Sequence, residues 1–584
     1  MRRTKIVSTI GPASSDEETL RKMVNQGLNV ARFNFSHGTY EERKKIFSLI
    51  KKIECDLDRP IGLMLDTRGP EIRTGSLKKE KVKLTEGNEV IVTNEDIEGD
   101  ENCISINYSG DLSVIEEGAS ILLDDGLIEL KVLDNGRRQL RCKVANGGWL
   151  GPNRGVNIPN YCPDLPAVTE QDKKDIKFGI KHGIHFIAAS FVRKAADVIE
   201  IRKLLEDEWA RDIKIISKIE NQKGVNNIDE IIEVSDGVMV ARGDLGVELP
   251  AEKVPVIQRT IINKCSERAR PVIIATEMLD SMIRNPRPTR AEASDVANAV
   301  FDGADAIMLS GETAIGSYPV EAVQIMDRIA RETEESPSYC QKFKKNKLSV
   351  SSTITEAISY ASCKAAADLD ARAIVTPTGS GSTAIKVSQN RPLTPIIAVT
   401  PNRTVQHTLT LCWGVNPLLV DRSESTDKMI DDAVQVALER EIVSNGDLVT
   451  ITAGVPVGTP GTTNLIKVDI VGEPLVEGQG IGRGIVSGKV KIVQNADQAL
   501  GEIEEGDILV TYMTNEQFAP ALEKAAAVIT QEGGLSSHAA VTGLELDIPV
   551  IVNAGNIMEL VQNGDPVTVD GIRGQVFPGI VKIH

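Results

Sequence analysis

The stretch KIISKIENQKGVNNIDEIIEVSDGVMVARGD, residues 214–244, contains one strand–helix–strand unit. Its apolar runs Lys214–Lys218 and Gly237–Ala241 have the length and composition of strands that are buried on both faces. The segment between them is typical of a turn followed by an amphipathic helix. Units of this kind predict a parallel α/β fold.

The same unit recurs across the first 330 residues, with one interruption. Eight strands alternating with helices favour a (β/α)8 TIM barrel, and a doubly wound parallel sheet is the alternative. The apolar runs that predict the eight strands are Lys5–Ile10, Leu28–Phe33, Ile61–Asp66, His185–Ser190, Lys214–Lys218, Gly237–Ala241, Pro271–Thr276 and Asp305–Ser310.

The interruption runs from Asp66 to His185, about 120 residues without another unit. Asp124-Asp125-Gly126 and Asp134-Asn135-Gly136 are hairpin signals within it. We therefore predict a small β-barrel domain at 70–168, inserted into a catalytic barrel of residues 1–69 and 169–340 as a lid over its carboxyl face. The segments that read as strands are Lys81–Thr93, Ser120–Leu123, Leu127–Leu133 and Arg138–Val144.

Two further domains are predicted after the barrel, so that the 584 residues divide into four. The polar segment Glu334–Ser349 marks a boundary, and residues 351–472 form an open α/β domain. The glycine-rich passage Gly478–Gly484 lies near the start of the last domain, residues 473–584. The elements expected in the α/β domain are helix 355–369, strands Ala371–Thr376 and Pro395–Val399, helix 425–441 and strand Asp447–Ala453.

Composition excludes several classes of protein. The net charge of −17, from 66 basic and 83 acidic residues, argues against a general affinity for nucleic acid or anionic membranes. The eight cysteines form no C-x-x-C pair, which indicates free thiols in a reducing cytoplasm. The six histidines are scattered, the N-terminus does not read as a signal peptide, and no apolar run has the length of a membrane span.

Charged side chains that could bind ligands or take part in catalysis cluster where the predicted fifth and sixth strands end. Lys218 and Glu220 are two residues apart and face one side of the strand, and Asp244 lies one unit further on. Two carboxylates beside a lysine at a barrel mouth suit a divalent cation and an anionic oxygen substrate. For Lys-x-Glu alone a structural salt bridge is the better interpretation, but Asp244 at the next strand end favours the site.

Other strand ends add donors and acceptors to the same mouth. Arg32 and Arg73 offer forked donors for phosphate, although each alone is more often a solvated surface charge. Thr276 offers a hydroxyl. The oxygen ligands suited to a second, weaker cation such as K⁺ are Asn34, Ser36, Asp66 and Thr67.

Several long motifs give the chain a resemblance to the pyruvate kinases over about residues 1–470. The family's fold agrees with the barrel, the inserted β domain and the α/β domain predicted above. The motifs are Thr9–Ser14, Ala31–Gly38, Leu65–Thr74, Ile216–Asn221, Ala241–Gly246, Ala275–Ser281 and Leu309–Ala314.

The resemblance implies a cytoplasmic glycolytic homotetramer that transfers the phosphoryl group of phosphoenolpyruvate to ADP, giving pyruvate and ATP. It implies that Glu220 and Asp244 hold Mg²⁺ or Mn²⁺ and that Lys218 lies beside the transferred group. Thr276 should lie in the path of the proton that reaches the enolate, although an ordered water is an equal candidate for the final acid. Arg32 and Arg73 should clamp phosphate.

The resemblance implies further binding roles. Gly243 matches a substrate-binding position. Glu71 matches the acidic residue of K⁺-using members, which predicts K⁺ activation through Asn34, Ser36, Asp66 and Thr67. Arg154 stands where many members have lysine. The positions that match the nucleotide side are Pro12, Asn34, His37, Arg73 and Arg154.

A second anion site is predicted in the α/β domain. Hydroxyls and backbone N–H groups at the start of a helix form a phosphate cradle, although a loop that only caps the helix fits the same residues. The family binds phosphorylated effectors at this loop, which favours the cradle, and a sugar monophosphate, a sugar bisphosphate or AMP would fit. The residues are Thr378, Ser380, Gly381, Ser382 and Thr383.

The last domain contains Thr530-Gln-Glu-Gly-Gly-Leu-Ser-Ser-His538, which resembles the phosphohistidine motif of phosphoenolpyruvate synthase and pyruvate phosphate dikinase. His538 would carry the phosphoryl group there. Ser536 replaces the usual threonine, and no ATP-grasp domain is found, so a purely structural domain is the alternative. A dikinase-type phosphotransferase and a non-catalytic paralogue are the competing hypotheses for the whole chain.

Overall fold

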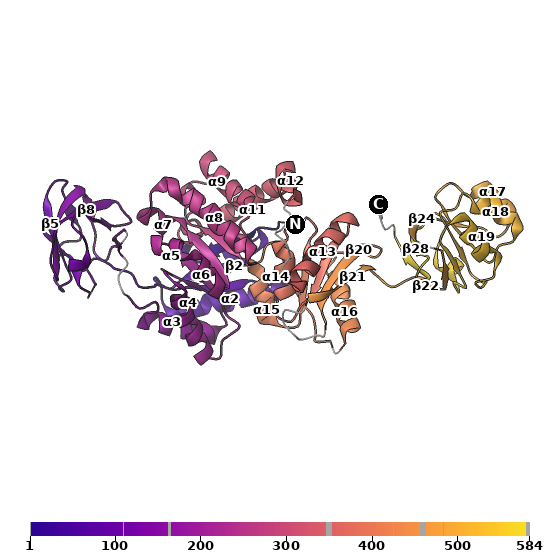
Figure 1. The fold of residues 1–584 in the computed structure, drawn as a ribbon, viewed down its shortest axis with the longest axis horizontal. Coiled ribbons are helices and arrows are strands. Elements are labelled where there is room, and N and C mark those ends of the chain that lie inside the picture. The colour runs from indigo at the N-terminus through magenta and orange to yellow at the C-terminus, as the bar shows by residue number, and fades with distance from the viewer. Residues whose placement is uncertain are drawn as a thin grey trace. The chain divides into compact units, whose positions relative to one another are not determined.

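The computed structural model describes residues 2–108, 110–159, 161, 165–345, 353–423, 425–455, 463–482 and 484–579 (Figure 1). Tertiary contacts divide the chain into two compact units. The first comprises Met1–Lys345 with His407–Gly414, and the second comprises Asn346–Gln406 with Val415–His584. The domain limits given above stay predictions.

The first unit contains a closed barrel of eight parallel strands in the order β1-β16-β15-β14-β13-β12-β3-β2, as predicted. Nearly every residue of these strands is buried, because helices cover the outside and side chains fill the inside. The strands are β1 (Lys5–Thr9), β2 (Val30–Asn34), β3 (Gly62–Asp66), β12 (Phe186–Ala189), β13 (Lys214–Ile219), β14 (Gly237–Ala241), β15 (Val272–Ala275) and β16 (Ala306–Leu309).

Helices connect the strands, and three of them begin with a capping box at Thr39, Thr169 or Thr289. Two helices, α5 and α6, lie between β13 and β14. The helices are α1 (Glu17–Asn25), α2 (Tyr40–Leu57), α3 (Glu170–His182), α4 (Ala195–Asp207), α5 (Gln222–Asn226), α6 (Ile228–Val234), α7 (Arg242–Glu248), α8 (Val254–Glu267), α9 (Arg290–Asp302), α10 (Gly311–Ala314), α11 (Pro319–Glu335) and α12 (Pro337–Lys345), with 3₁₀ turns η1 (Pro12–Ser14), η3 (Ala251–Lys253) and η4 (Asp280–Ile283).

The segment Glu334–Ser349, predicted as a boundary, is partly helical. Pro337 is the first residue of α12, a position that proline favours because it needs no N–H partner there. The limit between the compact units lies after Lys345, within the same segment.

A short segment from beyond the barrel, His407–Gly414, belongs to the first unit. Leu411 joins Val7, Met64 and Phe186 in the cluster that fills the barrel interior. Gly62 leaves room for it, since a Cβ there would lie 2.7 Å from Thr410 Oγ1. These contacts are at the amino ends of the strands, so we call residues 407–414 the floor segment. The sequence did not predict it.

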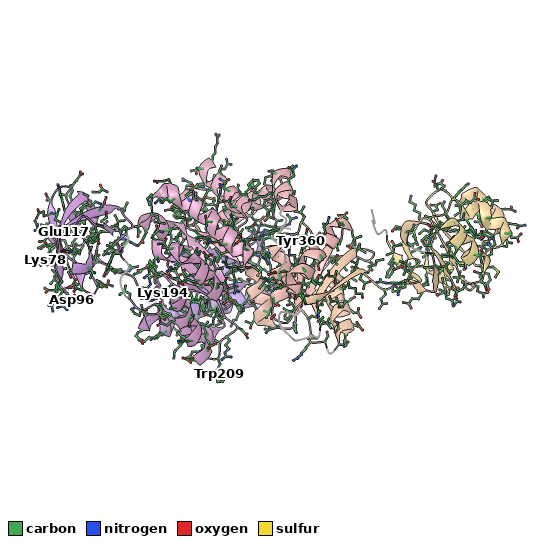
Figure 2. All side chains as sticks on the ribbon, viewed as in Figure 1. Lys78, Asp96, Glu117, Lys194, Trp209 and Tyr360 are labelled. Atoms are coloured by element: carbon green, nitrogen blue, oxygen red, sulfur yellow. The ribbon has the colours of Figure 1, made fainter. Side chains whose placement is uncertain are left out.

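The inserted domain, which we call the lid, has one apolar core under a six-stranded sheet, β11-β7-β8-β9-β5-β6, and a two-stranded one, β10-β4. Its turn Asp124-Asp125-Gly126 joins β7 to β8 with all three residues at positive φ, as the hairpin signal predicted. Figure 2 shows Lys78, Asp96 and Glu117 projecting outward from it. Its strands are β4 (Val82–Leu84), β5 (Glu89–Thr93), β6 (Cys103–Ser105), β7 (Ser120–Leu123), β8 (Ile128–Asn135), β9 (Gln139–Asn146), β10 (Gly148–Leu150) and β11 (Val156–Asn157), with 3₁₀ turn η2 (Leu112–Val114).

The prediction of one strand over Lys81–Thr93 was wrong. The chain turns between β4 and β5 at Gly87, whose φ is +86°, and the two strands enter different sheets. A glycine favours this left-handed turn because it has no Cβ to clash.

The second unit begins with a five-stranded sheet in the order β19-β18-β17-β20-β21, in which only β21 is antiparallel to its neighbour. The predicted helices and strands are confirmed within a few residues, whereas β19 and β21 were not predicted. The elements of this part of the chain are α13 (Ile354–Asp368), β17 (Ala373–Pro377), α14 (Ser382–Gln389), β18 (Ile396–Thr400), α15 (Arg403–Thr408), β19 (Val415–Leu419), α16 (Thr426–Glu439), β20 (Leu448–Gly454) and β21 (Thr463–Ile470). The 3₁₀ turn η5 (Leu409–Leu411) and the last residues of α15 lie in the floor segment, which belongs to the first unit.

The last part of the second unit is an eight-stranded mixed sheet, β22-β29-β28-β24-β25-β26-β27-β23. Among the described residues of the chain, no helix combines the length and apolarity that crossing a membrane requires. The elements are β22 (Val476–Glu477), β23 (Gln479–Ile481), β24 (Ile485–Ile492), α17 (Ala496–Glu502), β25 (Ile508–Thr511), η6 (Glu516–Phe518), α18 (Ala519–Leu522), β26 (Ala527–Thr530), α19 (His538–Leu546), β27 (Val550–Val552), α20 (Ile557–Leu560), β28 (Pro566–Asp570) and β29 (Gln575–Pro578).

Candidate active site

Lys218 lies at the carboxyl face of the barrel, near the end of β13. Its Nζ is 3.1 Å from Asp66 Oδ1, 2.8 Å from Ser190 Oγ and 2.9 Å from Glu220 Oε1. Lys218 and Glu220 meet because alternate residues of a strand project to the same side. All four side chains are buried, so this is a charged cluster inside the protein.

Electrostatics keep Lys218 charged and raise the pKa values of Glu220 and Asp244. Burial lowers the pKa of Lys218, but the negative charges of Asp66 and Glu220 raise it by more than burial lowers it. The pKa of Lys218 therefore lies above its ordinary value. Burial raises the pKa of Glu220 to about 7, and nearby Asp244 adds to the rise. The pKa of Asp244 is also raised, mainly by burial. A cation held between Glu220 and Asp244 would relieve this repulsion.

The donor set fits a hard divalent cation that binds together with substrate. Within the described ranges, no group of three or more His, Cys, Asp or Glu side chains is arranged to hold a metal ion. Glu220 and Asp244 would supply two carboxylates, and substrate oxygens and water would complete the shell, as Mg²⁺ prefers.

Arg32 is buried and has structural partners, which excludes the solvated surface charge considered above. Its Nε is 2.5 Å from Asp66 Oδ2, and its Nη1 donates to Thr9 Oγ1 at 2.7 Å. Burial raises the pKa of Asp66, but Arg32 and Lys218 outweigh it, so the net pKa is lowered. Asp66 therefore pairs with two positively charged side chains, Arg32 and Lys218, at the barrel mouth.

Thr276 follows β15 in a left-handed conformation with φ +68°, which costs a β-branched residue about 1–3 kcal/mol. Its Oγ1 accepts a 2.7 Å hydrogen bond from the Gly243 N–H and donates to the Ala275 carbonyl at 2.6 Å. Arg242 braces the Thr276 carbonyl at 2.8 Å and pairs with Asp295. The structure thus brings the predicted Thr276 and Gly243 together.

The residues predicted to bind a monovalent cation lie around the ends of β2 and β3. Asn34 and Asp66 are register partners on these adjacent strands. Asn34 Oδ1 accepts the Ser36 N–H at 2.9 Å, and the Thr67 carbonyl accepts Ser190 Oγ–H at 2.8 Å. Asp66 is thus part of the Lys218 cluster, Asn34 and Thr67 lie beside it, and Ser36 is linked to it through Asn34.

A cavity of about 520 Å³ lies between the lid and the barrel. Arg73 lines it with its Nε 2.6 Å from Glu71 Oε2, and Arg154 lines it 3.4 Å from Asp124. Five predicted site residues line this cavity: His37, Glu71, Arg73, Arg154 and Asp244. Those that do not line it are Pro12, Arg32, Asn34, Ser36, Asp66, Thr67, Lys218, Glu220, Gly243 and Thr276.

Three residues of the site were not predicted. Ser190 connects Lys218 to Thr67, and the Phe191 N–H donates to Glu220 Oε2 at 2.5 Å. Asp172 Oδ1 accepts the N–H groups of Arg68 and Gly69 at 3.0 and 3.4 Å, where the chain leaves the barrel for the lid. Ser190 and Phe191 follow β12, and a position just after a barrel strand was the one signal that would have found them.

Comparison with known proteins accounts for most of the chain. Residues 1–323 match the barrel domain of pyruvate kinase, residues 356–469 its alpha/beta domain, and residues 503–574 the mobile domain of PEP-utilising enzymes. The chain belongs to the pyruvate kinase family. It is therefore an enzyme, a phosphotransferase.

Several relatives named pyruvate kinase match along their full length. Those from Bacillus licheniformis, Geobacillus stearothermophilus and Sporosarcina psychrophila are 52%, 50% and 49% identical, each over 100% of both chains. The C-terminal domain is thus shared by these pyruvate kinases and is not an isolated addition to this chain.

The loop before α14 is the predicted effector site. Thr378 Oγ1 accepts the Gly381 N–H at 3.0 Å, and Thr383 Oγ1 bonds Thr463 Oγ1 at 2.9 Å, so both side chains have internal partners. Ser380 is exposed and its Oγ donates to Ser382 Oγ at 3.1 Å. The two serines are therefore the hydroxyls that face solvent.

His538 is the first residue of α19 in the C-terminal domain and is half-buried. Its Nδ1 is 3.1 Å from Thr514 Oγ1, and its Nε2 is 3.4 Å from Thr542 Oγ1. The ring is thus held between two threonine hydroxyls.

Proposed function

We propose that the chain carries out the reaction of its family at the carboxyl face of the barrel, in the side-chain cluster around Lys218. The reaction transfers a phosphoryl group from phosphoenolpyruvate to ADP. The observation that carries the proposal is the buried contact of Lys218 with Asp66, Ser190 and Glu220, beside Asp244. Tight packing of charged groups inside the protein costs folding energy, which favours a catalytic role over a structural one.

Glu220 and Asp244 would hold a Mg²⁺ or Mn²⁺ ion together with the substrate. The bound ion would supply positive charge that neutralises the phosphate and carboxylate oxygens of phosphoenolpyruvate. The raised pKa values of both carboxylates support this assignment, because burial and neighbouring negative charges disfavour their charged forms and a bound cation would offset both effects.

The side chains around the ion would position and stabilise the transferred group. An ADP phosphate oxygen attacks phosphorus as the bond to the enol oxygen breaks, and Lys218 Nζ stabilises the charge that develops on the phosphoryl oxygens. Arg32 and Arg73 hold phosphate oxygens, and Arg32 still has Nη2 to offer because its other nitrogens contact Asp66 and Thr9. Thr276 lies in the path that brings a proton to the methylene carbon of the enolate, which yields pyruvate.

The test is formation of pyruvate and ATP from phosphoenolpyruvate and ADP, measured with Mg²⁺ and after its removal with a chelator. Glu220→Gln should abolish both this activity and the binding of Mn²⁺ alone. Retained Mn²⁺ binding in that variant would show that the ion lies elsewhere.

K⁺ activation is proposed for the oxygen atoms around Asn34, Ser36, Asp66 and Thr67. Their position beside the Lys218 cluster supports this role, as does the pairing of Glu71 with Arg73. Turnover at constant ionic strength should fall when Na⁺ or a bulky ammonium ion replaces K⁺, and unchanged turnover would defeat the proposal.

Allosteric regulation by a phosphorylated effector is proposed for the loop Thr378–Thr383. The exposed hydroxyls of Ser380 and Ser382 beside the start of α14 support it. Saturation curves for phosphoenolpyruvate should shift with a sugar monophosphate, a sugar bisphosphate or AMP. Ser382→Ala should remove that shift without changing the kinetics in the absence of effector.

The phosphohistidine role of His538 stays a prediction. Labelled phosphoenolpyruvate should leave acid-labile label on the protein that disappears in His538→Ala. Absence of label, with full activity in the variant, would support the structural alternative.

The homotetramer and the cytoplasmic location also stay predictions. A reducing compartment agrees with the free thiols of the described cysteines, which are Cys55, Cys103, Cys142, Cys265, Cys340, Cys363 and Cys412.

A further inference from the structure

Lys223 is the second residue of α5 and lies three residues after Glu220. It lines the cavity between the lid and the barrel, and it is exposed. In the part of the chain that the structure describes, its ammonium group forms no ion pair and no hydrogen bond. The reaction as proposed above gives this lysine no task.

The other basic side chains that line the cavity each have a carboxylate partner. A carboxylate close to a guanidinium group cancels much of its field, so a paired arginine attracts a second anion less than an unpaired cation does. The pairs are Arg73 with Glu71 at 2.5 Å, Arg154 with Asp124 at 3.4 Å and Arg193 with Asp197 at 3.2 Å. On the described wall of this cavity, Lys223 is therefore the basic side chain whose charge no carboxylate offsets.

The cavity wall also carries carboxylates beyond those pairs. Asp125, Asp244 and Glu248 line it as well. A cation bound at Asp244 would offset part of this negative charge. An anionic ligand in the cavity nevertheless needs further positive charge close to it, and Lys223 is placed to supply that charge.

The backbone that carries Lys223 is firmly held. Asn221 caps α5 by accepting the Gly224 N–H at 2.8 Å through its side-chain oxygen. A Cβ on Gly224 would lie 2.6 Å from the carbonyl oxygen of Val192, so α5 packs closely against the turn that follows β12. The Lys223 side chain thus starts from a fixed point, while its four-carbon stem can adjust to a ligand.

We propose that Lys223 is a substrate-binding residue that contacts the diphosphate of ADP in this cavity and sets the affinity for the nucleotide. An ammonium group is a compact charge with three donors, which suits phosphate oxygens. Arg73 and Arg154, both predicted on the nucleotide side, line the same cavity. The inference rests on the reaction proposed above.

The other substrate is the less suitable ligand for Lys223. Three of the residues proposed to act on phosphoenolpyruvate, Lys218, Glu220 and Arg32, do not line the cavity. The cavity therefore extends away from the Lys218 cluster, and the nucleotide is the substrate left to occupy it.

The experiment measures initial rates while ADP and phosphoenolpyruvate are varied in turn, at fixed Mg²⁺, K⁺ and ionic strength. Lys223→Met should raise the KM for ADP about 10-fold, because it removes a charge-assisted hydrogen bond to phosphate. The kcat and the KM for phosphoenolpyruvate should stay unchanged. Lys223→Arg keeps the charge and should resemble wild type, whereas Lys223→Glu adds repulsion and should raise the KM for ADP more than Lys223→Met does.

Lys194→Met is the matched control. Lys194 is exposed at the start of α4, as Figure 2 shows, and it does not line the cavity. This variant removes the same charge from the barrel, so it reports any effect of net charge alone. Its KM for ADP should equal that of wild type.

An unchanged KM for ADP in Lys223→Met would overturn the proposal, and so would an equal rise in the KM for phosphoenolpyruvate. Arg154→Met separates this inference from the position of the nucleotide. A rise in the KM for ADP in Arg154→Met but not in Lys223→Met refutes only the role of Lys223. No rise in either variant shows that the nucleotide binds outside this cavity, and absence of pyruvate and ATP formation by wild type refutes the proposed reaction itself.

Discussion

Lys218 lies where three consecutive strands of the barrel ring end, and it takes one partner from each. Asp66 ends β3, Ser190 follows β12 and Glu220 follows β13. A buried ammonium group with two carboxylates beside it keeps its charge, as the raised pKa of Lys218 indicates. The residue is thus a fixed positive charge, suited to stabilising a transition state and unsuited to exchanging protons.

Lys218→Met should lower kcat by about three orders of magnitude, because it removes a preorganised charge from the transferred phosphoryl group. Mn²⁺ binding should be largely retained, since Glu220 and Asp244 are unchanged. Lys214→Met, at the opposite end of β13, is the control and should turn over like wild type. Substantial turnover by Lys218→Met would mean that the electrostatic centre lies elsewhere.

His185 predicts a pH dependence of stability. Its ring stacks on His407 with centroids 4.1 Å apart, its Nδ1 accepts the Leu63 N–H, and burial lowers its pKa well below 6.5. The unfolded chain therefore binds a proton that the folded chain refuses, so the stability present above pH 6.5 is lost as the pH falls below it.

The free energy of unfolding of wild type should fall more steeply below pH 6.5 than that of His185→Gln. The difference in slope should approach about 1.4 kcal/mol per pH unit. Urea unfolding, monitored by fluorescence at several pH values between 5 and 8, measures this difference in slope. Parallel curves for the two proteins would contradict the assignment.

At the scale of elements, helix α3 supports the lid as well as the barrel. Asp172 is the third residue of α3, where it forms the capping box with Thr169, and one of its oxygens accepts Thr169 Oγ1–H at 2.6 Å. The other oxygen accepts the N–H groups of Arg68 and Gly69 at the point where the lid begins. One buried carboxylate therefore both starts a helix and anchors a connection.

Asp172→Ala should lower the free energy of unfolding by about 2–4 kcal/mol, because it leaves several buried donors without an acceptor. Glu42→Ala is the matched control, since Glu42 holds the same position in the capping box of α2 but is exposed and bonds only Thr39. That variant should cost about 0.5–1 kcal/mol. Equal losses would show that the contacts to Arg68 and Gly69 contribute nothing.

The elements that local pattern decides could be predicted from the sequence. The barrel strands are buried on both faces, so each is an apolar run, and Lys218, Glu220 and Asp244 follow from strand periodicity and unit spacing. Contacts between distant residues could not be predicted. Ser190 and Asp172 are ordinary polar residues in the sequence, and only the closed ring of strands brings them to their partners.

Backbone conformation at the site is the other feature that could not be predicted from the sequence. Thr276 and the following Glu277 both adopt positive φ, which neither residue type favours. The hydrogen bond from Gly243 and the brace from Arg242 stabilise this turn, and both come from the unit before it. Strain of this kind at a strand end is typical of functional sites and leaves no local sequence signal.

At the scale of the whole molecule, the proposed catalytic side chains all precede residue 345, whereas the C-terminal domain contributes to the packing of the second unit. Phe577 joins Leu448 and Ile470 in one apolar cluster, and Arg573 lies 3.0 Å from Asp469. The domain thus packs against part of the five-stranded sheet.

A chain that ends at Gly472 should keep kcat within about threefold of the full enzyme, because the reaction site is intact. Its α/β domain should lose about 1–3 kcal/mol of stability through exposure of Leu448 and Ile470. Activity assays and thermal unfolding measure the two effects. A large loss of kcat would assign the C-terminal domain a part in catalysis.

The floor segment determines when, during synthesis of the chain, the interior of the barrel can be completed. Strand β16 closes the barrel at Leu309, yet Leu411, which completes the interior cluster with Val7 and Met64, is made much later. A nascent chain emerging from the ribosome therefore carries a barrel whose amino end stays open to water until residue 414 is released. Fragments cut at Lys345 should aggregate or bind chaperones for the same reason, although they contain every strand of the barrel.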